Sequence, residues 1–414
     1  MPGARGRRRA GGRLSVDAAA GTRLARGLGL DRNTGAVAAA VFLMGLGEQL
    51  WKRFVPKYLE AMGAPVLAIG GYGAAGDFLD GVYQYPGGWI ADRWGRRRAL
   101  TLFVALAGAG YAVYALAPSW PWLFAGLALS AAWASMASPA LFAAIGDSLP
   151  RGRRAVGFAV QSLLRRVPIA VAPALGGLAI AAYGVRGGVR AGLAVSLALA
   201  LATLAVVSRV RIPVAADAAP VRMADVWRRL PAALRWLLVS DVFVRTCEGM
   251  VEVFLVLYAT NVVGISAPRY GLLVTVEMAA AILCYLPAAR MAERTGQKPF
   301  VIATFLMFSL FPLAVVLSRS WAALALAFVV GGLREVGEPS RKALIVDLAE
   351  PGLRARTVGL YYLVRSVAIT PASLVGGLLW RVSPQLPFAV ACGIGLAGTA
   401  VFAATVHERH LRDQ

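Results

Sequence analysis

The sequence predicts an all-α polytopic membrane protein. Hydrophobic residues make up 58% of the chain and charged residues only 15%, and the mean hydropathy is +0.65. Soluble domains have a smaller apolar share and about 25% charged residues. An α-helix needs roughly 20 apolar residues to cross about 30 Å of hydrocarbon, and stretches of that size recur along almost the whole sequence. Lipid is therefore the predicted solvent for most of the chain.

Twelve such apolar stretches are predicted to be transmembrane helices. They cover residues 34–60, 64–91, 98–117, 120–149, 153–182, 188–208, 233–262, 267–293, 298–318, 320–349, 353–382 and 385–406. An even number of spans returns the chain to the side of the membrane from which it started. Both termini are therefore expected on the same side.

The distribution of basic residues predicts which side that is. The net charge is +22, which in a soluble protein would favour nucleic-acid binding. Here the basic clusters lie before the first span and after the second, fourth, sixth, eighth and tenth spans, near residues 5–13, 93–98, 151–154, 209–229, 290–298 and 354–356. The positive-inside rule then places both termini in the cytoplasm. Membrane orientation explains the charge, so no nucleic-acid partner is predicted.

The two halves of the sequence resemble each other at an offset close to 200. Glu48 falls on Glu248, Phe54 on Phe254 and Tyr58 on Tyr258, and further matches continue to Gly176-Gly177 and Gly376-Gly377. Because each repeat holds six spans, both halves cross the membrane in the same orientation, related by an axis along the membrane normal. The predicted organisation is a basic cytoplasmic tail (1–33), a six-helix bundle (34–208), a cytoplasmic linker (209–232), a second six-helix bundle (233–406) and a cytoplasmic C-terminal tail (407–414).

The loop after the second span reads GWIADRWGRRR over residues 88–98. It resembles the signature loop of the major facilitator superfamily, G-x-L-A-D-R-x-G-R-[RK], and the resemblance extends over residues 34–406. It implies a twelve-helix transporter of two bundles, with the loop as a gating motif made of Gly88, Asp92, Arg93, Gly95 and Arg96. In that motif Gly95 permits a tight turn, and Asp92 can latch one conformation by pairing with a base or a helix N-terminus.

The fifth span contains Ala172-Pro173-Ala174-Leu175-Gly176-Gly177. This resembles the G-P-x-x-G-G motif of the family's antiporters, with alanine in place of the first glycine. The resemblance implies that Pro173, Gly176 and Gly177 bend and closely pack the helix as a hinge and seal, and it favours export. The alternative is generic, because proline and glycine are common in membrane helices. In the fourth span, residues 131–144 carry no charge, whereas the family's drug antiporters have an arginine there, so proton coupling through that motif is not supported.

Ionisable residues at mid-membrane depth are the candidates for a substrate and proton site, because each costs several kcal/mol unless it faces water or a partner. Helix rise places these groups in a single charged layer. The candidates are Glu48, Asp77, Asp80, Glu248, Glu252, Glu277, Arg334, Glu338 and Arg365.

Two interpretations of this layer remain open: a substrate and proton site, or mutually neutralising pairs that fix the packing. The symmetry-related Glu48 and Glu248 are favoured as site residues, since low dielectric favours the uncharged form of a carboxyl group. Arg341 and Lys342 are expected to reach towards the cytoplasmic surface.

Several classes of function are not supported by the sequence. None of the lysines follows a glycine, so there is no phosphate-binding P-loop, and the only histidines are His407 and His410 in the tail. The three cysteines have no metal-ligand spacing. No enzymatic activity, cofactor or metal is therefore predicted. A cation site built only from carboxylates, Glu48, Asp77, Asp80 and Glu248, remains open.

The predicted function is secondary active transport by alternating access, with proton-coupled export of a small organic solute as the first hypothesis. The alternatives are uptake or uniport of a charged metabolite or cation and, in another class, a membrane sensor or lipid flippase. The expected partners are the solute, protons and the lipid bilayer. The expected location is a bacterial cytoplasmic (inner) membrane, and the expected state is a monomer.

Overall fold

The computed structural model describes residues 32–137, 154–208, 227–349 and 354–406, and these residues are helical almost throughout, with no strand among them. The predicted tails, most of the linker at 209–232 and the second half of the fourth span lie outside the described residues. The all-α polytopic fold with twelve helical spans is confirmed.

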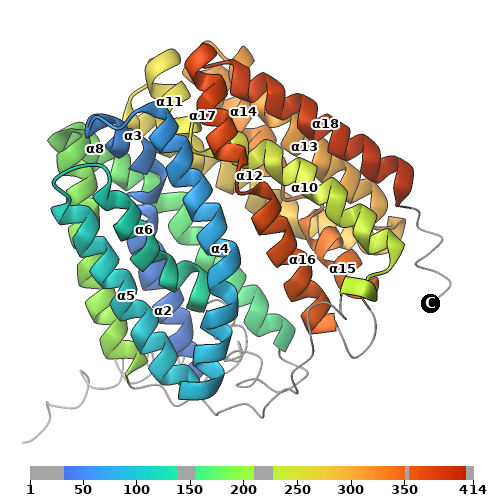
Figure 1. The fold of residues 1–414 in the computed structure, drawn as a ribbon, viewed down its shortest axis with the longest axis horizontal. Coiled ribbons are helices and arrows are strands. Elements are labelled where there is room, and N and C mark those ends of the chain that lie inside the picture. The colour runs from blue at the N-terminus through green and yellow to red at the C-terminus, as the bar shows by residue number, and fades with distance from the viewer. Residues whose placement is uncertain (1–31, 138–153, 209–226, 350–353, 407–414) are drawn as a thin grey trace, which may run out of the picture.

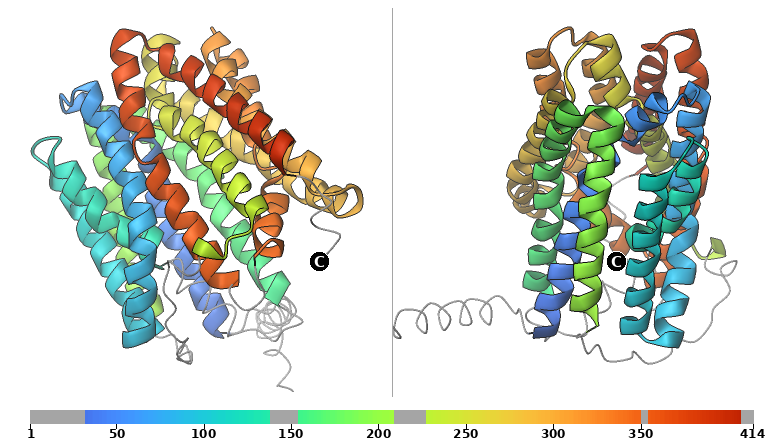
Figure 2. Two further views of the ribbon diagram at one scale, coloured as in Figure 1. Left: turned by 45° about the vertical axis from the view of Figure 1, so that its right-hand side comes forward. Right: turned by 90° about the vertical axis from the view of Figure 1, so that its left-hand side faces the viewer.

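The first half contains six spans, and its fifth and sixth spans form a single continuous element. The elements are α2 (Arg32–Gln49) with η1 (Lys52–Phe54) and α3 (Val55–Ala61), α4 (Val66–Trp94), α5 (Arg96–Leu116), α6 (Trp122–Ala131) with the π-helical η2 (Ala132–Met136), and α8 (Arg154–Val207). Within α8 the chain reverses at Gly184, whose φ of 72° an L-residue with a side chain rarely adopts. Its two arms, the fifth and sixth spans, lie side by side in Figure 2.

The second half repeats this order of spans. Its elements are α10 (Ala232–Glu252) with α11 (Leu255–Leu257) and η4 (Tyr258–Val262), α12 (Ala267–Thr295), α13 (Lys298–Leu317), α14 (Trp321–Leu333) with α15 (Glu338–Asp347), α16 (Arg354–Ile369) with α17 (Ala372–Val382), and α18 (Leu386–Thr405). In Figure 1 the blue-to-green half and the yellow-to-red half stand beside each other. We call the end where α2 begins and α4 turns into α5 the tail face, and the end where α3 and α11 lie the far face.

Six described segments are long and apolar enough to cross a membrane by length and composition alone. They are Arg96–Leu116, Arg165–Val207, Ala267–Ala292, Lys298–Leu317, Thr357–Val382 and Leu386–Thr405. The first, seventh and tenth spans are instead divided by short breaks, at residues 50–54, 253–254 and 334–337. Non-helical backbone at membrane depth is tolerated where it is buried in protein or lines a cavity. The breaks therefore indicate where the interior of the molecule is polar.

The two halves meet near the far face through glycines that allow close approach. A Cβ at Gly177 of α8 would collide with the backbone of Ala267 at the start of α12. At the equivalent place across the pseudo-twofold axis, a Cβ at Gly70 of α4 would collide with the carbonyl oxygen of Ser373 in α17. Small residues are typical of such tight helix contacts in membranes. The α8–α12 and α4–α17 contacts therefore hold the halves together at this end.

Candidate functional site

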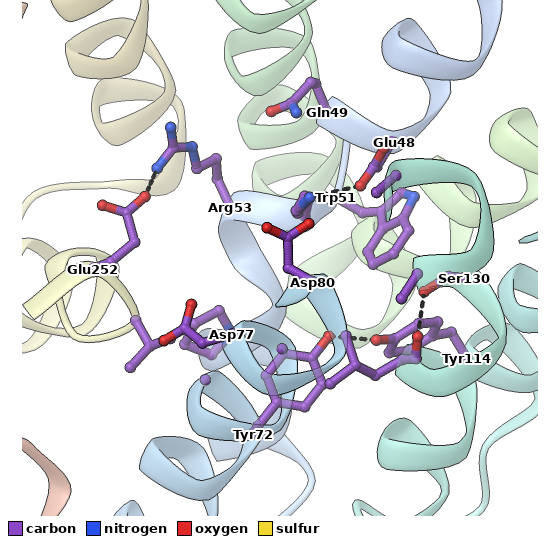
Figure 3. A pocket seen from close by; sticks show the side chains of 18 of the residues that line it. Glu48, Gln49, Trp51, Arg53, Tyr72, Asp77, Asp80, Tyr114, Ser130 and Glu252 are labelled. Carbon is purple, nitrogen blue, oxygen red and sulfur yellow. Dashed lines mark hydrogen bonds and ion pairs between the residues drawn. The ribbon is translucent and has the colours of Figure 1, made fainter. Parts of the chain in front are cut away.

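A cavity of about 500 Å³ lies among the first five spans and reaches the second half at Glu252, Val253 and Tyr270. Figure 3 shows that polar and aromatic side chains of α2, η1, α4, α5 and α6 point into it. Its polar and aromatic lining residues are Glu48, Gln49, Trp51, Lys52, Arg53, Tyr72, Asp77, Asp80, Tyr114, Ser130, Ser135, Glu252 and Tyr270. The first span supplies four of these residues at its break, Gln49, Trp51, Lys52 and Arg53, because the chain there leaves the regular helix.

Four of the charged groups in the cavity are paired. Lys52 Nζ lies 2.7 Å from Glu48 Oε1, one helical turn away. The guanidinium of Arg53 donates to Glu252 of the second half, so this ion pair bridges the two halves (Figure 3). Each pair cancels its own charge. Glu48 therefore does not stand alone in the cavity as a bare carboxylate.

Asp77 and Asp80 have no counter-charge within hydrogen-bonding distance in the described part of the chain. They lie three residues apart on α4, so they share one face of the helix. The hydroxyl of Ser135 in η2 donates to Asp80 Oδ1 at 2.8 Å. Asp77 has neither a hydrogen bond nor an ion pair among residues 32–137, 154–208, 227–349 and 354–406. These two carboxylates are the unneutralised charge of the cavity.

The second half holds a separate group of charges, which we call the charge zipper. It joins four carboxylates on α10, α12 and α15 to four guanidiniums on α10, α15, α16 and the break before α15. Its members are Asp241, Glu248, Glu277 and Glu338 with Arg245, Arg334, Arg341 and Arg365. Its formal charges are equal in number and opposite in sign.

The zipper connects four spans of the second half, those of α10, α12, α15 and α16, through long side chains. Arg341 is only 1% exposed and lies 2.8 Å from Asp241, which is fully buried. Arg245 donates to both Glu338 and Glu248. Arg334 donates to Glu277 and, at 3.4 Å, to Glu248. Glu248 therefore contacts two guanidiniums, in contrast to Asp77 and Asp80.

The structure divides the predicted single charged layer into two groups. Glu48, Asp77, Asp80 and Glu252 line the cavity, whereas Glu248, Glu277, Arg334, Glu338 and Arg365 belong to the zipper. The predicted symmetry of Glu48 and Glu248 holds in position but not in environment. The open alternative of a carboxylate-only cation site at Glu48, Asp77, Asp80 and Glu248 is not found, since no group of metal-binding side chains occurs in the described residues.

Three zipper residues, Asp241, Arg245 and Arg341, were not predicted as site residues. Arg341 was expected to reach the membrane surface, but it is buried against Asp241 and Glu338; that expectation is wrong. Asp241 was overlooked. The spacing of Asp241, Arg245, Glu248 and Glu252, in steps of four, three and four, places all four on one face of a helix. A polar stripe of that kind through an apolar span is the sequence signal that could have found them.

The sequence motifs occupy structurally distinct places. Gly95, with a φ of 82°, makes the turn between α4 and α5 at the tail face, and Arg96 after it is buried. The guanidinium of Arg93 lies over the ring of Trp89. The side chain of Asp92 lies outside the described residues. In α8, a Cβ at Gly176 would overlap the carbonyl oxygen of Leu50 at the break of the first span, and Gly376 has the same relation to Met250.

Arg53 and Glu252 provide a test of the contact at the far face. Replacing Arg53 with glutamine should make the cavity about fivefold more accessible from that face, since a partly exposed ion pair contributes about 1 kcal/mol. The measurement is the rate at which a membrane-impermeant maleimide, supplied to the far face, modifies a cysteine at position 130 (Ser130→Cys). Cys284 is replaced by alanine beforehand, because it is partly exposed and could react. Cys247 and Cys392 are buried and can remain.

The matched control exchanges the two charges, with Arg53→Glu and Glu252→Arg in one protein. That exchange should return the modification rate to its original value. Equal rates in the unaltered protein and in Arg53→Gln would show that the ion pair does not hold the two halves together.

The fold and the charged cavity among its first five spans define a polytopic membrane protein with a polar interior site. The sequence matches the family model of the Major Facilitator Superfamily twice, over residues 37–243 and 237–413. The chain belongs to this superfamily. Each match begins near the start of one repeat, in agreement with the internal repeat of about 200 residues.

Relatives and solved structures agree with this family. An uncharacterised MFS-type transporter of Methanocaldococcus jannaschii is 24% identical over 168 residues, which cover 39% of this chain and 42% of that protein. The uncharacterised MFS-type transporter YqjV of Bacillus subtilis is 24% identical over 177 residues, 42% of each chain. The alignments thus span about two fifths of these relatives' length.

Two transporter structures have the same fold. The nucleoside transporter NupG superposes with a TM-score of 0.76 at 13% identity, covering 90% of this chain and 100% of that one. A POT family transporter in complex with 5-aminolevulinic acid superposes with a TM-score of 0.75 at 13% identity, covering 90% and 95%. At these identities the likeness concerns the fold.

Proposed function

We propose that this member of the superfamily is a secondary active transporter that exports a small organic solute in exchange for protons. The observation that carries the proposal is the pair Asp77 and Asp80, two carboxylates in an interior cavity with no counter-charge within hydrogen-bonding distance among the described residues. A carboxylate in that position can exchange a proton for a solute without first breaking an ion pair. Neutralising such charges inside a membrane is strongly favourable.

The ion pairing favours Asp77 and Asp80 over Glu48 and Glu248 as the proton carriers of this proposal. Glu48 is paired with Lys52, and Glu248 contacts Arg245 and Arg334. A carboxylate held by two guanidiniums stays charged and fixed in place. The zipper then gives the second half a rigid interior against which the first half can move.

Alternating access uses the contacts between the halves. In the present arrangement α8 packs on α12 and α4 on α17 near the far face, and Arg53 is paired with Glu252 below them. Separation of these contacts, with approach of the halves at the tail face, would turn the cavity to the other side of the membrane. The Arg-rich loops of the tail face favour a cytoplasmic tail face, so the cavity takes up solute from the cytoplasm.

The test is solute-driven proton movement in proteoliposomes that contain a pH-sensitive dye. We expect a solute gradient to move protons in the opposite direction. We expect Asp77→Asn or Asp80→Asn to reduce the signal to that of protein-free liposomes, because the neutral amide cannot carry the proton. The matched control is Asp347→Asn, the same chemical change at an exposed position of α15, which should leave the signal unchanged.

Each other outcome identifies a different function. Solute flux without proton movement would indicate uniport. Flux that survives both Asp77→Asn and Asp80→Asn would remove these residues from the coupling mechanism. No flux for cationic, neutral, anionic or zwitterionic solutes would favour a lipid flippase or a membrane sensor on the same scaffold.

A further inference from the structure

We infer that the solute is an organic cation, and that Asp77 and Asp80 hold its positively charged group in the cavity. The inference rests on the proposed function, whose transport pathway passes through this cavity, and adds the chemical class of the solute. It is carried by three features of the cavity: its charge, its aromatic walls and an unfilled hydrogen-bond acceptor.

The charge of the cavity is negative once the paired groups are set aside. Lys52 is matched by Glu48 and Arg53 by Glu252. Asp77 and Asp80 remain, and with both ionised the lining carries two uncompensated negative charges. An anion would be repelled by these carboxylates and would have to pull Lys52 or Arg53 out of an existing ion pair. A cation is attracted without any such rearrangement.

The walls beside the two aspartates are aromatic. Trp51, Tyr72, Tyr114 and Tyr270 line the same cavity, and hydrogen bonds fix several of these rings. The indole N–H of Trp51 donates to Ser196 Oγ at 3.0 Å, and the hydroxyls of Tyr72 and Tyr114 bond to each other. Aromatic faces attract ammonium groups and also accept the apolar parts of a ligand. An organic cation therefore suits this lining better than a bare metal ion, for which no ligand group is found in the described residues.

A further wall residue lacks a hydrogen-bond donor. The side-chain oxygen Oε1 of Gln49 is buried and accepts no hydrogen bond from the described residues, and Gln49 lines the cavity at the break of the first span. A buried acceptor without a partner is costly. An ammonium N–H would supply the missing donor, whereas an anion would add a further acceptor.

The size of the cavity fits a small organic molecule. Its volume of about 500 Å³ falls within the 300–1,000 Å³ that is typical of small-molecule sites. Residues three apart on a helix have Cβ atoms about 5–6 Å apart. Asp77 and Asp80 can therefore contact one ammonium group between them. Protons and the cation then compete for the same two carboxylates, which makes their exchange obligatory.

The test compares two ions of the same shape and opposite charge, tetraphenylphosphonium and tetraphenylborate. Binding to the purified full-length protein in detergent is measured by equilibrium dialysis. We expect saturable binding of tetraphenylphosphonium and none of tetraphenylborate. Asp77→Asn and Asp80→Asn should each weaken cation binding by at least about tenfold, the effect of losing a close charge pair. Asp347→Asn is the control and should bind as the unaltered protein does.

Two further measurements keep the test decisive. Asp77→Glu retains the charge and should recover most of the cation binding that Asp77→Asn loses, which a merely structural role would not explain. Thermal unfolding of every variant identifies loss of the folded protein. The inference is overturned if tetraphenylborate binds as well as tetraphenylphosphonium, if cation binding is unchanged in both asparagine variants, or if the folded protein binds no cation.

The inference and the proposed function can fail separately. Proton movement that is driven by a neutral or anionic solute and lost in Asp77→Asn would keep the transporter and refute the cationic solute. Cation binding that needs Asp77 and Asp80, without flux in proteoliposomes, would keep the cation site and refute the transport cycle.

Discussion

Replacing Arg341 with glutamine is expected to destabilise the folded protein by about 3–5 kcal/mol, the cost of breaking a buried ion pair from one side. Arg341 is 1% exposed and contacts the carboxylates of Asp241 and Glu338. Without the guanidinium of Arg341, the zipper would hold four carboxylates and only three positive charges. Asp241 and Glu338 would stay buried, and one negative charge of the zipper would be left uncompensated. The measurement is the thermal or denaturant-induced unfolding of the purified protein in detergent.

The control for this prediction is Arg381→Gln, which removes the same group at an exposed position of α17. It should change stability by a few tenths of a kcal/mol. Adding Asp241→Asn to Arg341→Gln should recover part of the loss, because the zipper is then balanced again. If Arg341→Gln unfolds at the same point as Arg381→Gln, the zipper does not stabilise the second half.

Replacing Gly177 with valine is expected to lower the transport rate by about 5- to 100-fold, since overpacking a close contact costs about 1–3 kcal/mol. The added side chain would meet the backbone of Ala267 and Pro268 in the other half. Backbone cannot move aside as the end of a flexible side chain can. The α8–α12 contact at the far face would therefore close less often. The rate is measured in proteoliposomes with the solute found by the proton-movement screen.

The matched control for Gly177→Val is Gly393→Val in α18, where an added Cβ meets nothing within 4 Å. Transport should be unchanged in that variant. In Gly177→Val, cysteine modification at position 130 from the far face should become faster, because a contact that cannot close leaves the cavity open. Normal transport by a folded Gly177→Val protein would show that this close approach is not needed for the cycle.

The fold could be predicted because it depends on properties that a sequence displays directly. The lengths of the apolar stretches give the twelve spans, and Glu48/Glu248 and Phe54/Phe254 give the repeat that relates the halves. The signature loop from Gly88 to Arg96 gives the family. None of these signals depends on how side chains of different helices meet.

The arrangement of the site could be predicted only in part, because ion pairing depends on which side chains of different helices lie in contact. A spacing of four residues places Lys52 beside Glu48 on one helix face, and the two are paired. The same spacing places Arg334 beside Glu338, but the partners of Glu338 are Arg341 and Arg245. Helical spacing finds neighbours within one helix. It does not show which side chain of the neighbouring helix forms the ion pair. The role of Asp241 and the separation of the zipper from the cavity were therefore not predicted.

The pair Arg53–Glu252 also bears on the history of the chain. The breaks of the first and seventh spans are equivalent, yet one carries Lys52 and Arg53 where the other carries Glu252 and Val253. In a homodimer of identical six-helix subunits both breaks would carry the same residues, so two basic breaks would face each other across the axis. Two repeats within one chain can differ in sequence, and here that difference replaces the repulsion with the attraction between Arg53 and Glu252.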